Sequence, residues 1–174
     1  HLFQTTYGLS SETWQLRLDQ SDAGAAQLAS AVPEKLLMAC SEMVKRHNMK
    51  LVSVQPYLMS AFNRFKSQIQ RTDAWFALVE PGTICLAHIH EGQWMRVRSA
   101  RLDEGWEAFT RFMAREAFMG DSERQTEKPL LYVYAPHLGS LQTLDEWEVH
   151  ELPSFLPTSL ADETDNCLVM ALSG

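Results

Sequence analysis

Two short turns in the middle of the chain constrain its fold more than any other feature. The first is Glu-Pro-Gly-Thr at residues 80–83, and the second is Glu-Gly at residues 91–92. They separate an apolar segment, 75–79, from two further strand-like segments, 84–90 and 94–102. Because turns this short join neighbouring antiparallel strands, the sequence predicts a three-strand meander over residues 75–102.

Three further elements are expected after the meander. Aromatic and apolar residues at spacings of three and four predict a helix between Trp106 and Ala117, and Gly120 suits its C-terminal cap. A buried strand is expected at 130–134, a second strand at 147–152, and a closing helix at 162–172. This order is typical of a ribonuclease H-like α/β domain, in which an antiparallel meander and parallel strands form one mixed sheet flanked by helices.

The first 72 residues show a different pattern. Strands are expected near residues 14–18 and 28–32, an amphipathic helix follows Pro33, a buried strand covers 51–54, and a helix covers 57–69. Such a strand-helix-strand-helix segment predicts parallel pairing with right-handed crossovers. We therefore expect a single α/β domain over residues 1–174, itself a candidate fragment of a longer protein, with a segment at 1–72 and a ribonuclease H-like core at 73–174.

Composition narrows the classes of partner. The net charge of -7 gives no general attraction to nucleic acid or to anionic lipid, so neither is an expected partner. Arg96, Arg98 and Arg101 are the best candidate for a basic patch, but a solvated strand face is the favoured interpretation. No apolar run reaches the length of a membrane span, and Cys40 and Cys85 lie among apolar neighbours, so a cytoplasmic protein with reduced thiols is expected.

Two stretches resemble a known family. They are LASAVPEKLLMACSEMVKRHNMKLVSVQPYLMSAFNRF at 28–65 and WFALVEPGTICLAHIHEGQWMRVRSARL at 75–102. Their pattern of elements is similar to bacterial actin-like pilus-assembly proteins of the PilM type and to the cytoplasmic domain of the type II secretion L protein, over roughly residues 28–119. The resemblance implies one half of an actin-like fold, of the actin/hexokinase superfamily. It also implies that the protein acts at the cytoplasmic face of the inner membrane.

The same resemblance points to one candidate nucleotide site. Glu80, Gly82 and Thr83 stand where the family has the Asp, Gly and Thr of a phosphate-binding turn. Here the acid is one methylene longer, and Pro81 removes a backbone amide donor. The sequence shows neither a second glycine-rich phosphate turn nor an adenosine-binding Gly-Gly motif; Leu138-Gly139-Ser140 does not supply one.

These departures favour a non-catalytic scaffold or interaction module that uses no cofactor. Its partner would be a protein, such as an inner-membrane assembly component, and a homodimer is also compatible with the sequence. The alternative is an actin-like protein that binds ATP and Mg²⁺ through the 80–83 turn. A two-metal nuclease is disfavoured because the expected strands carry no cluster of carboxylates.

A metal site is the last candidate. His88 and His90 are two residues apart on one expected strand, so their side chains share a face and could hold one metal ion. A usable site needs a third ligand, for which Glu91, His137 and His150 are the candidates. Two partly exposed histidines near a strand end remain the favoured interpretation.

Overall fold

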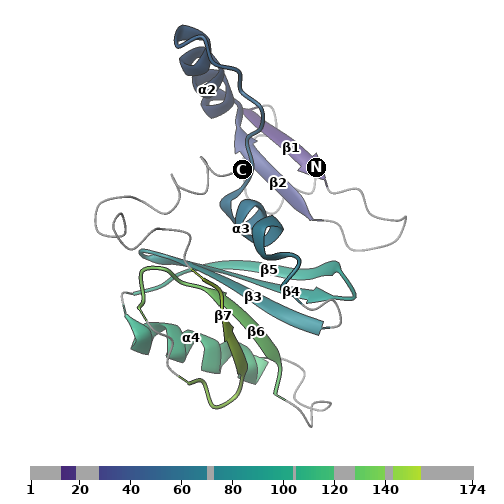
Figure 1. Ribbon diagram of the computed structural model, residues 1–174, viewed down its shortest axis with the longest axis vertical. Helices are drawn as coiled ribbons and strands as arrows, with labels where there is room; N and C mark the ends of the chain where they lie inside the picture. The colour runs from purple at the N-terminus through teal and green to yellow at the C-terminus, as the bar shows by residue number, and fades with distance from the viewer. Residues whose placement is uncertain are drawn as a thin grey trace. The chain divides into compact units, whose positions relative to one another are not determined.

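The chain divides into two compact units, His1–Pro56 and Tyr57–Gly174. The computed structural model describes residues 13–18, 28–69, 73–103, 105–119, 128–139 and 143–153 (Figure 1). Gly120 and the expected helix at 162–172 lie outside the described residues. Each unit is described by itself.

The described residues of the first unit form two strands and one helix. β1 (Trp14–Leu18) pairs with β2 (Ala29–Pro33), and α2 (Glu34–Arg46) follows directly. The two strands run antiparallel. The expected parallel pairing, of the segments 28–32 and 51–54 across the intervening helix, is wrong because residues 51–54 form no strand.

The strand expected at residues 51–54 is also wrong. Leu51, Val52 and Val54 lie in an irregular segment and are 36%, 86% and 42% exposed. A strand needs a neighbour that accepts and donates its backbone hydrogen bonds. None of the described strands pairs with this segment, and its apolar composition alone does not supply a partner.

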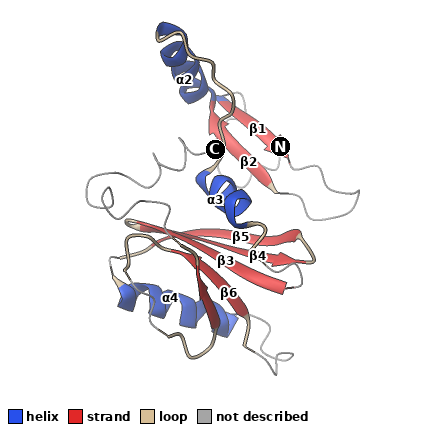
Figure 2. Ribbon diagram, viewed as in Figure 1, coloured by secondary structure: helices blue, strands red, loops and turns tan. Residues whose placement is uncertain are grey.

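The second unit is built on a five-stranded mixed sheet (Figure 2). Its strands, in chain order, are β3 (Asp73–Glu80), β4 (Thr83–His90), β5 (Gln93–Arg101), β6 (Leu130–Tyr134) and β7 (Glu148–Glu151). Their spatial order is β5-β4-β3-β6-β7. The β3–β4 and β4–β5 pairs are antiparallel, whereas β3–β6 and β6–β7 are parallel. The expected meander and the ribonuclease H-like α/β class are therefore confirmed.

Of the described helices, one packs on each face of this sheet (Figure 2). Strand residues alternate between the faces, so neighbours such as Ala77 and Leu78 belong to different cores. α4 (Trp106–Met119) covers one face with Phe109 and Met113. α3 (Tyr57–Phe65) covers the other.

α3 contributes to the core of the second unit. Leu58, Ala61 and Phe65 are buried in the same cluster as Phe76 and Tyr134. The rings of Phe65 and Tyr134 lie 5.3 Å apart. The sequence pattern places this helix with the first 72 residues, but its apolar face is buried on the sheet of the second unit.

A charged pair links β5 to α4. Among the described residues, Glu116 on α4 is the one charged residue that is buried. Its carboxylate accepts a hydrogen bond from Arg98 on β5, whose side chain is 33% exposed. A buried carboxylate without a partner is energetically costly. Arg98 removes this cost by balancing the negative charge of Glu116 on the face of the sheet that α4 covers.

Candidate functional site at the ends of β3 and β6

The turn at residues 80–83 is a tight connection between β3 and β4. Pro81 and Gly82 form it, and Gly82 has a φ of +76°, a left-handed value that glycine adopts without strain. Proline followed by glycine is the pattern of a type II turn. The Leu102 amide donates a hydrogen bond to the Gly82 carbonyl at 3.1 Å, which ties the turn to the chain after β5.

A depression of about 500 Å³ lies beside this turn. Glu80 and Gly82 line it together with Asp103 and Gly105, which precede α4, and His137, which follows β6. β3 and β6 are parallel neighbours, and the chain leaves them toward opposite edges of the sheet. The carboxyl ends of two such strands form a crevice in which open α/β sheets bind ligands.

The charge of the depression is acidic. Glu80 and Asp103 contribute carboxylates, and none of the described residues that line it is a lysine or an arginine. Two carboxylates repel a bare phosphate group, whereas a Mg²⁺ ion can bridge carboxylate and phosphate oxygens. These residues therefore fit a magnesium-bound phosphate better than a free anion. Thr83 starts β4, is exposed and is not among the residues that line the depression.

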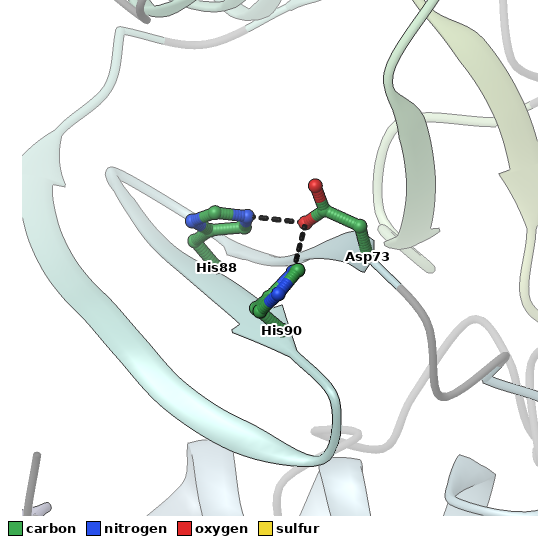
Figure 3. Close-up of polar contacts among 3 residues, drawn as sticks. All are labelled: Asp73, His88 and His90. Carbon is green, nitrogen blue, oxygen red and sulfur yellow. Dashed lines mark hydrogen bonds and ion pairs between the residues drawn. The ribbon is translucent and has the colours of Figure 1, made fainter. Parts of the chain in front are cut away.

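His88 and His90 lie elsewhere on the sheet, beside Asp73 at the start of β3 (Figure 3). His88 Nε2 is 2.5 Å from Asp73 Oδ1, and His90 Nδ1 is 3.8 Å from the same oxygen. The ring of Trp75 stacks on His88, with 4.5 Å between centroids. The carboxylate and the indole thus fix the orientation of His88.

Of the three candidates for a third metal ligand, Glu91 follows His90 in the turn after β4, whereas the two histidines lie elsewhere on the sheet. His137 follows β6, and His150 is on β7, which is separated from β4 by β3 and β6. Across the part of the chain that the structure describes, no group of three or more His, Cys, Asp or Glu side chains is arranged to hold a metal ion. His150 instead contacts Glu148 at 3.2 Å.

Asp73 was missed by the sequence analysis, although a signal for it exists. Once Pro81-Gly82 is taken as a two-residue turn, Glu80 pairs with Thr83, and counting back along both strands places Asp73 opposite His90. Asp103, Gly105 and His137 carry no such local signal. They meet at the depression because β5, α4 and β6 come together in the tertiary structure.

Cys85 is a half-buried thiol on β4, close to the turn at residues 80–83. Burial is the main cause that raises the pKa of Cys85 above its ordinary value of 9.0. A hydrogen bond from the Ser99 hydroxyl, at 3.4 Å from the sulfur, acts in the opposite direction. Because the thiolate is the nucleophile, Cys85 is a poor candidate for covalent catalysis at neutral pH.

Alkylation rates should reveal this raised pKa. At pH 7.5, Cys85 should react with iodoacetamide more slowly than free cysteine does, and its rate should keep rising above pH 9, where the rate for free cysteine levels off. Peptide mass spectrometry after timed quenching measures the rate at this residue. A Cys85 rate that levels off below pH 8.5 would contradict the prediction.

Among known proteins, the similarity found for this chain is one of fold. No family model matches the sequence, and no curated protein matches it. A solved Bacteroides thetaiotaomicron protein, described as having an actin-like ATPase fold and unknown function, aligns with a TM-score of 0.55 and 12% identity. The fold is actin-like. The alignment covers 99% of this chain and 63% of the Bacteroides protein, so this actin-like chain spans less than two thirds of that structure.

The helices that the structure describes are α2, α3 and α4. None of them is both long enough and apolar enough to cross a bilayer.

Proposed function

We propose that this chain is a non-catalytic protein-interaction module on an actin-like fold. The observation that carries the proposal is the number of large apolar side chains exposed in the first unit. No residue of α2 is buried, although the helix is amphipathic. The exposed apolar residues of α2 and of the segment after it are Leu36, Met38, Met43, Met49, Leu51, Val52 and Val54.

Exposed apolar groups in this number are unusual for a surface without a partner. Single exposed apolar residues are common, but groups of them indicate a surface that binds protein. Methionine side chains, which adapt their shape to a partner, make up three of the seven. The resemblance to pilus-assembly and type II secretion proteins favours an assembly component at the inner membrane as this partner.

Site-specific cross-linking tests this proposal. A photoreactive residue at Met43, in the full-length gene product in its own cells, should form one discrete adduct with an inner-membrane assembly component. The matched control is Lys45, an exposed polar position on the same helix that lies on a different side from Met43. The proposal fails if Met43 gives no discrete adduct, or if Lys45 gives the same adduct at equal yield.

The depression at the carboxyl ends of β3 and β6 favours a second candidate function. In this alternative, Glu80 and Asp103 hold Mg²⁺, and the ion carries the phosphates of ATP beside Gly82. Pro81 supplies no amide donor, and the lining residues include no lysine or arginine. For this reason ATP binding is the second candidate and not the first.

A thermal shift measurement separates the two candidates. The interaction module should show no change in melting temperature with 5 mM ATP and Mg²⁺. ATP binding at 100 times Kd would instead add about 2.7 kcal/mol of stability, and it would depend on Mg²⁺. A rise that disappears with EDTA and in Glu80→Ala would support ATP binding and contradict the purely non-catalytic module.

A further inference from the structure

Among the described strands, β5 is an edge strand, and none of them pairs with its outer side. It stands at one end of the strand order, with β4 on its inner side. The bond from the Leu102 amide to the Gly82 carbonyl fixes which residues of β5 bond to β4. Since these alternate along an antiparallel pair, the backbone N–H and C=O groups of Val97, Ser99 and Arg101 face away from β4.

Two arginines at this edge carry unbalanced charge. Arg98 is engaged with Glu116, but among the described residues neither Arg96 nor Arg101 has an ion-pair partner. Both are exposed, near opposite ends of the open stretch. In a protein with a net charge of -7, they make this edge a local site of positive charge.

The side chains of β5 also differ between the faces of the sheet. Arg96 pairs with His88 on the face that α4 covers, whereas Val97 pairs with Ala87 on the face that α3 covers. Val97 is 37% exposed, and Met95, at the register shift next to it, is 50% exposed. A strand added here would therefore meet Val97 and Arg101 on one face and Arg96 on the other.

The acidic edge strand of a second copy of this chain fits the β5 edge less well than a separate acidic segment would. β7 (Glu148–Glu151), at the opposite end of the sheet, carries two glutamates. The amides of Glu148 and Leu152 bond to the strand region of β6, so the free edge of β7 offers only Val149 and Glu151. Net charge of the same sign also opposes the approach of a second copy.

We propose that residues 97–101 of β5 bind an extended acidic segment of a partner protein, which adds to the sheet as a further strand. Backbone hydrogen bonds to Val97, Ser99 and Arg101 provide affinity, as in other cases of strand addition. A carboxylate on one face of the segment pairs with Arg96, and on the other face an apolar side chain packs on Val97 while a carboxylate pairs with Arg101. This surface is distinct from the apolar surface of α2, so either proposal can fail alone.

Charged residues on an edge strand can also serve only to prevent unwanted pairing with other strands. The test must therefore distinguish an edge that prevents pairing from an edge that binds a partner. The probe is the capped heptapeptide Glu-Glu-Val-Glu-Val-Glu-Glu, which can place glutamates beside both Arg96 and Arg101 and a valine beside Val97, and binding to the full chain is measured by calorimetry and by protection of the Val97 and Ser99 amides from exchange. There are three control peptides. Two are the same peptide N-methylated at alternate residues, one from the first residue and the other from the second. The third has lysine in place of glutamate.

Val97→Pro is the decisive variant. It removes an amide that faces outward and leaves the hydrogen bonds to β4 in place, so an unchanged melting profile of the second unit serves as the folding control. We expect it to weaken peptide binding at least about tenfold. Arg96→Glu and Arg101→Glu should each weaken binding in a salt-dependent way, while Arg111→Glu, an equal charge change on the exposed side of α4, should not.

Three results would overturn the proposal. One is the absence of binding at millimolar peptide. Another is binding that survives Val97→Pro or N-methylation in both registers. The third is self-association of the free chain that Val97→Pro abolishes, because that would make a second copy the occupant of the edge. Cross-linking from Met43 on α2 is unaffected by any of these results.

Discussion

Replacing Arg98 with methionine should lower the free energy of unfolding of the second unit by about 3–5 kcal/mol. The loss of stability comes from Glu116, the partner of Arg98 that remains in the variant. The carboxylate of Glu116 is 1% exposed and loses the guanidinium that balances it, and a buried charge without a partner is strongly destabilising. Urea unfolding followed by tryptophan fluorescence measures the change.

A neighbour on the same strand and a double variant make this prediction specific. Arg96→Met removes an equal charge from the same face of β5, but Arg96 is exposed and should change stability by no more than about 0.5 kcal/mol. Arg98→Met combined with Glu116→Leu replaces the pair with apolar groups and should recover most of the loss. If the double variant is as unstable as Arg98→Met, the unpaired carboxylate is not the cause.

Phe65→Ala should destabilise the second unit by about 3–5 kcal/mol, because it leaves a cavity in a fully buried site. Phe65 packs against Tyr134 on β6, so the effect tests whether α3 is part of the sheet's core. We expect the melting temperature of this unit to fall by roughly 10 °C. Circular dichroism and differential scanning calorimetry check the result.

Asn63→Ala is the matched control for this helix. Asn63 is exposed on α3, and its replacement leaves the buried face unchanged, so stability should shift by less than about 0.5 kcal/mol. A Phe65→Ala loss below about 1 kcal/mol would mean that α3 contributes little to the core, and the unit would then begin at β3.

The parts of the fold that were predictable depend on local signals. Pro81-Gly82 and Glu91-Gly92 are turns whose residue types need no distant partner, and they set the pairing of β3, β4 and β5. The periodicity of residues 106–117 likewise identified α4. The expectation for residues 51–54 failed because apolar composition predicts burial but cannot provide a neighbouring strand.

The candidate site was predictable only at the turn. The sequence pointed to Glu80, Gly82 and Thr83, and of these Glu80 and Gly82 line the depression. Asp103 and His137 complete it from loops that are 20 or more residues from Gly82 along the chain. Their approach depends on how β5, α4 and β6 pack, which no local pattern encodes.

The sequence by itself therefore determined the meander, the register around Pro81-Gly82 and the ribonuclease H-like class, because turns and periodicity act between close neighbours. Only the tertiary structure decided that α3 packs on the sheet, that Glu116 is buried against Arg98 and that β5 is an edge strand of the described sheet. These are contacts between segments far apart in the chain. Whether they form depends on the fit of surfaces that come together only after the strands have paired.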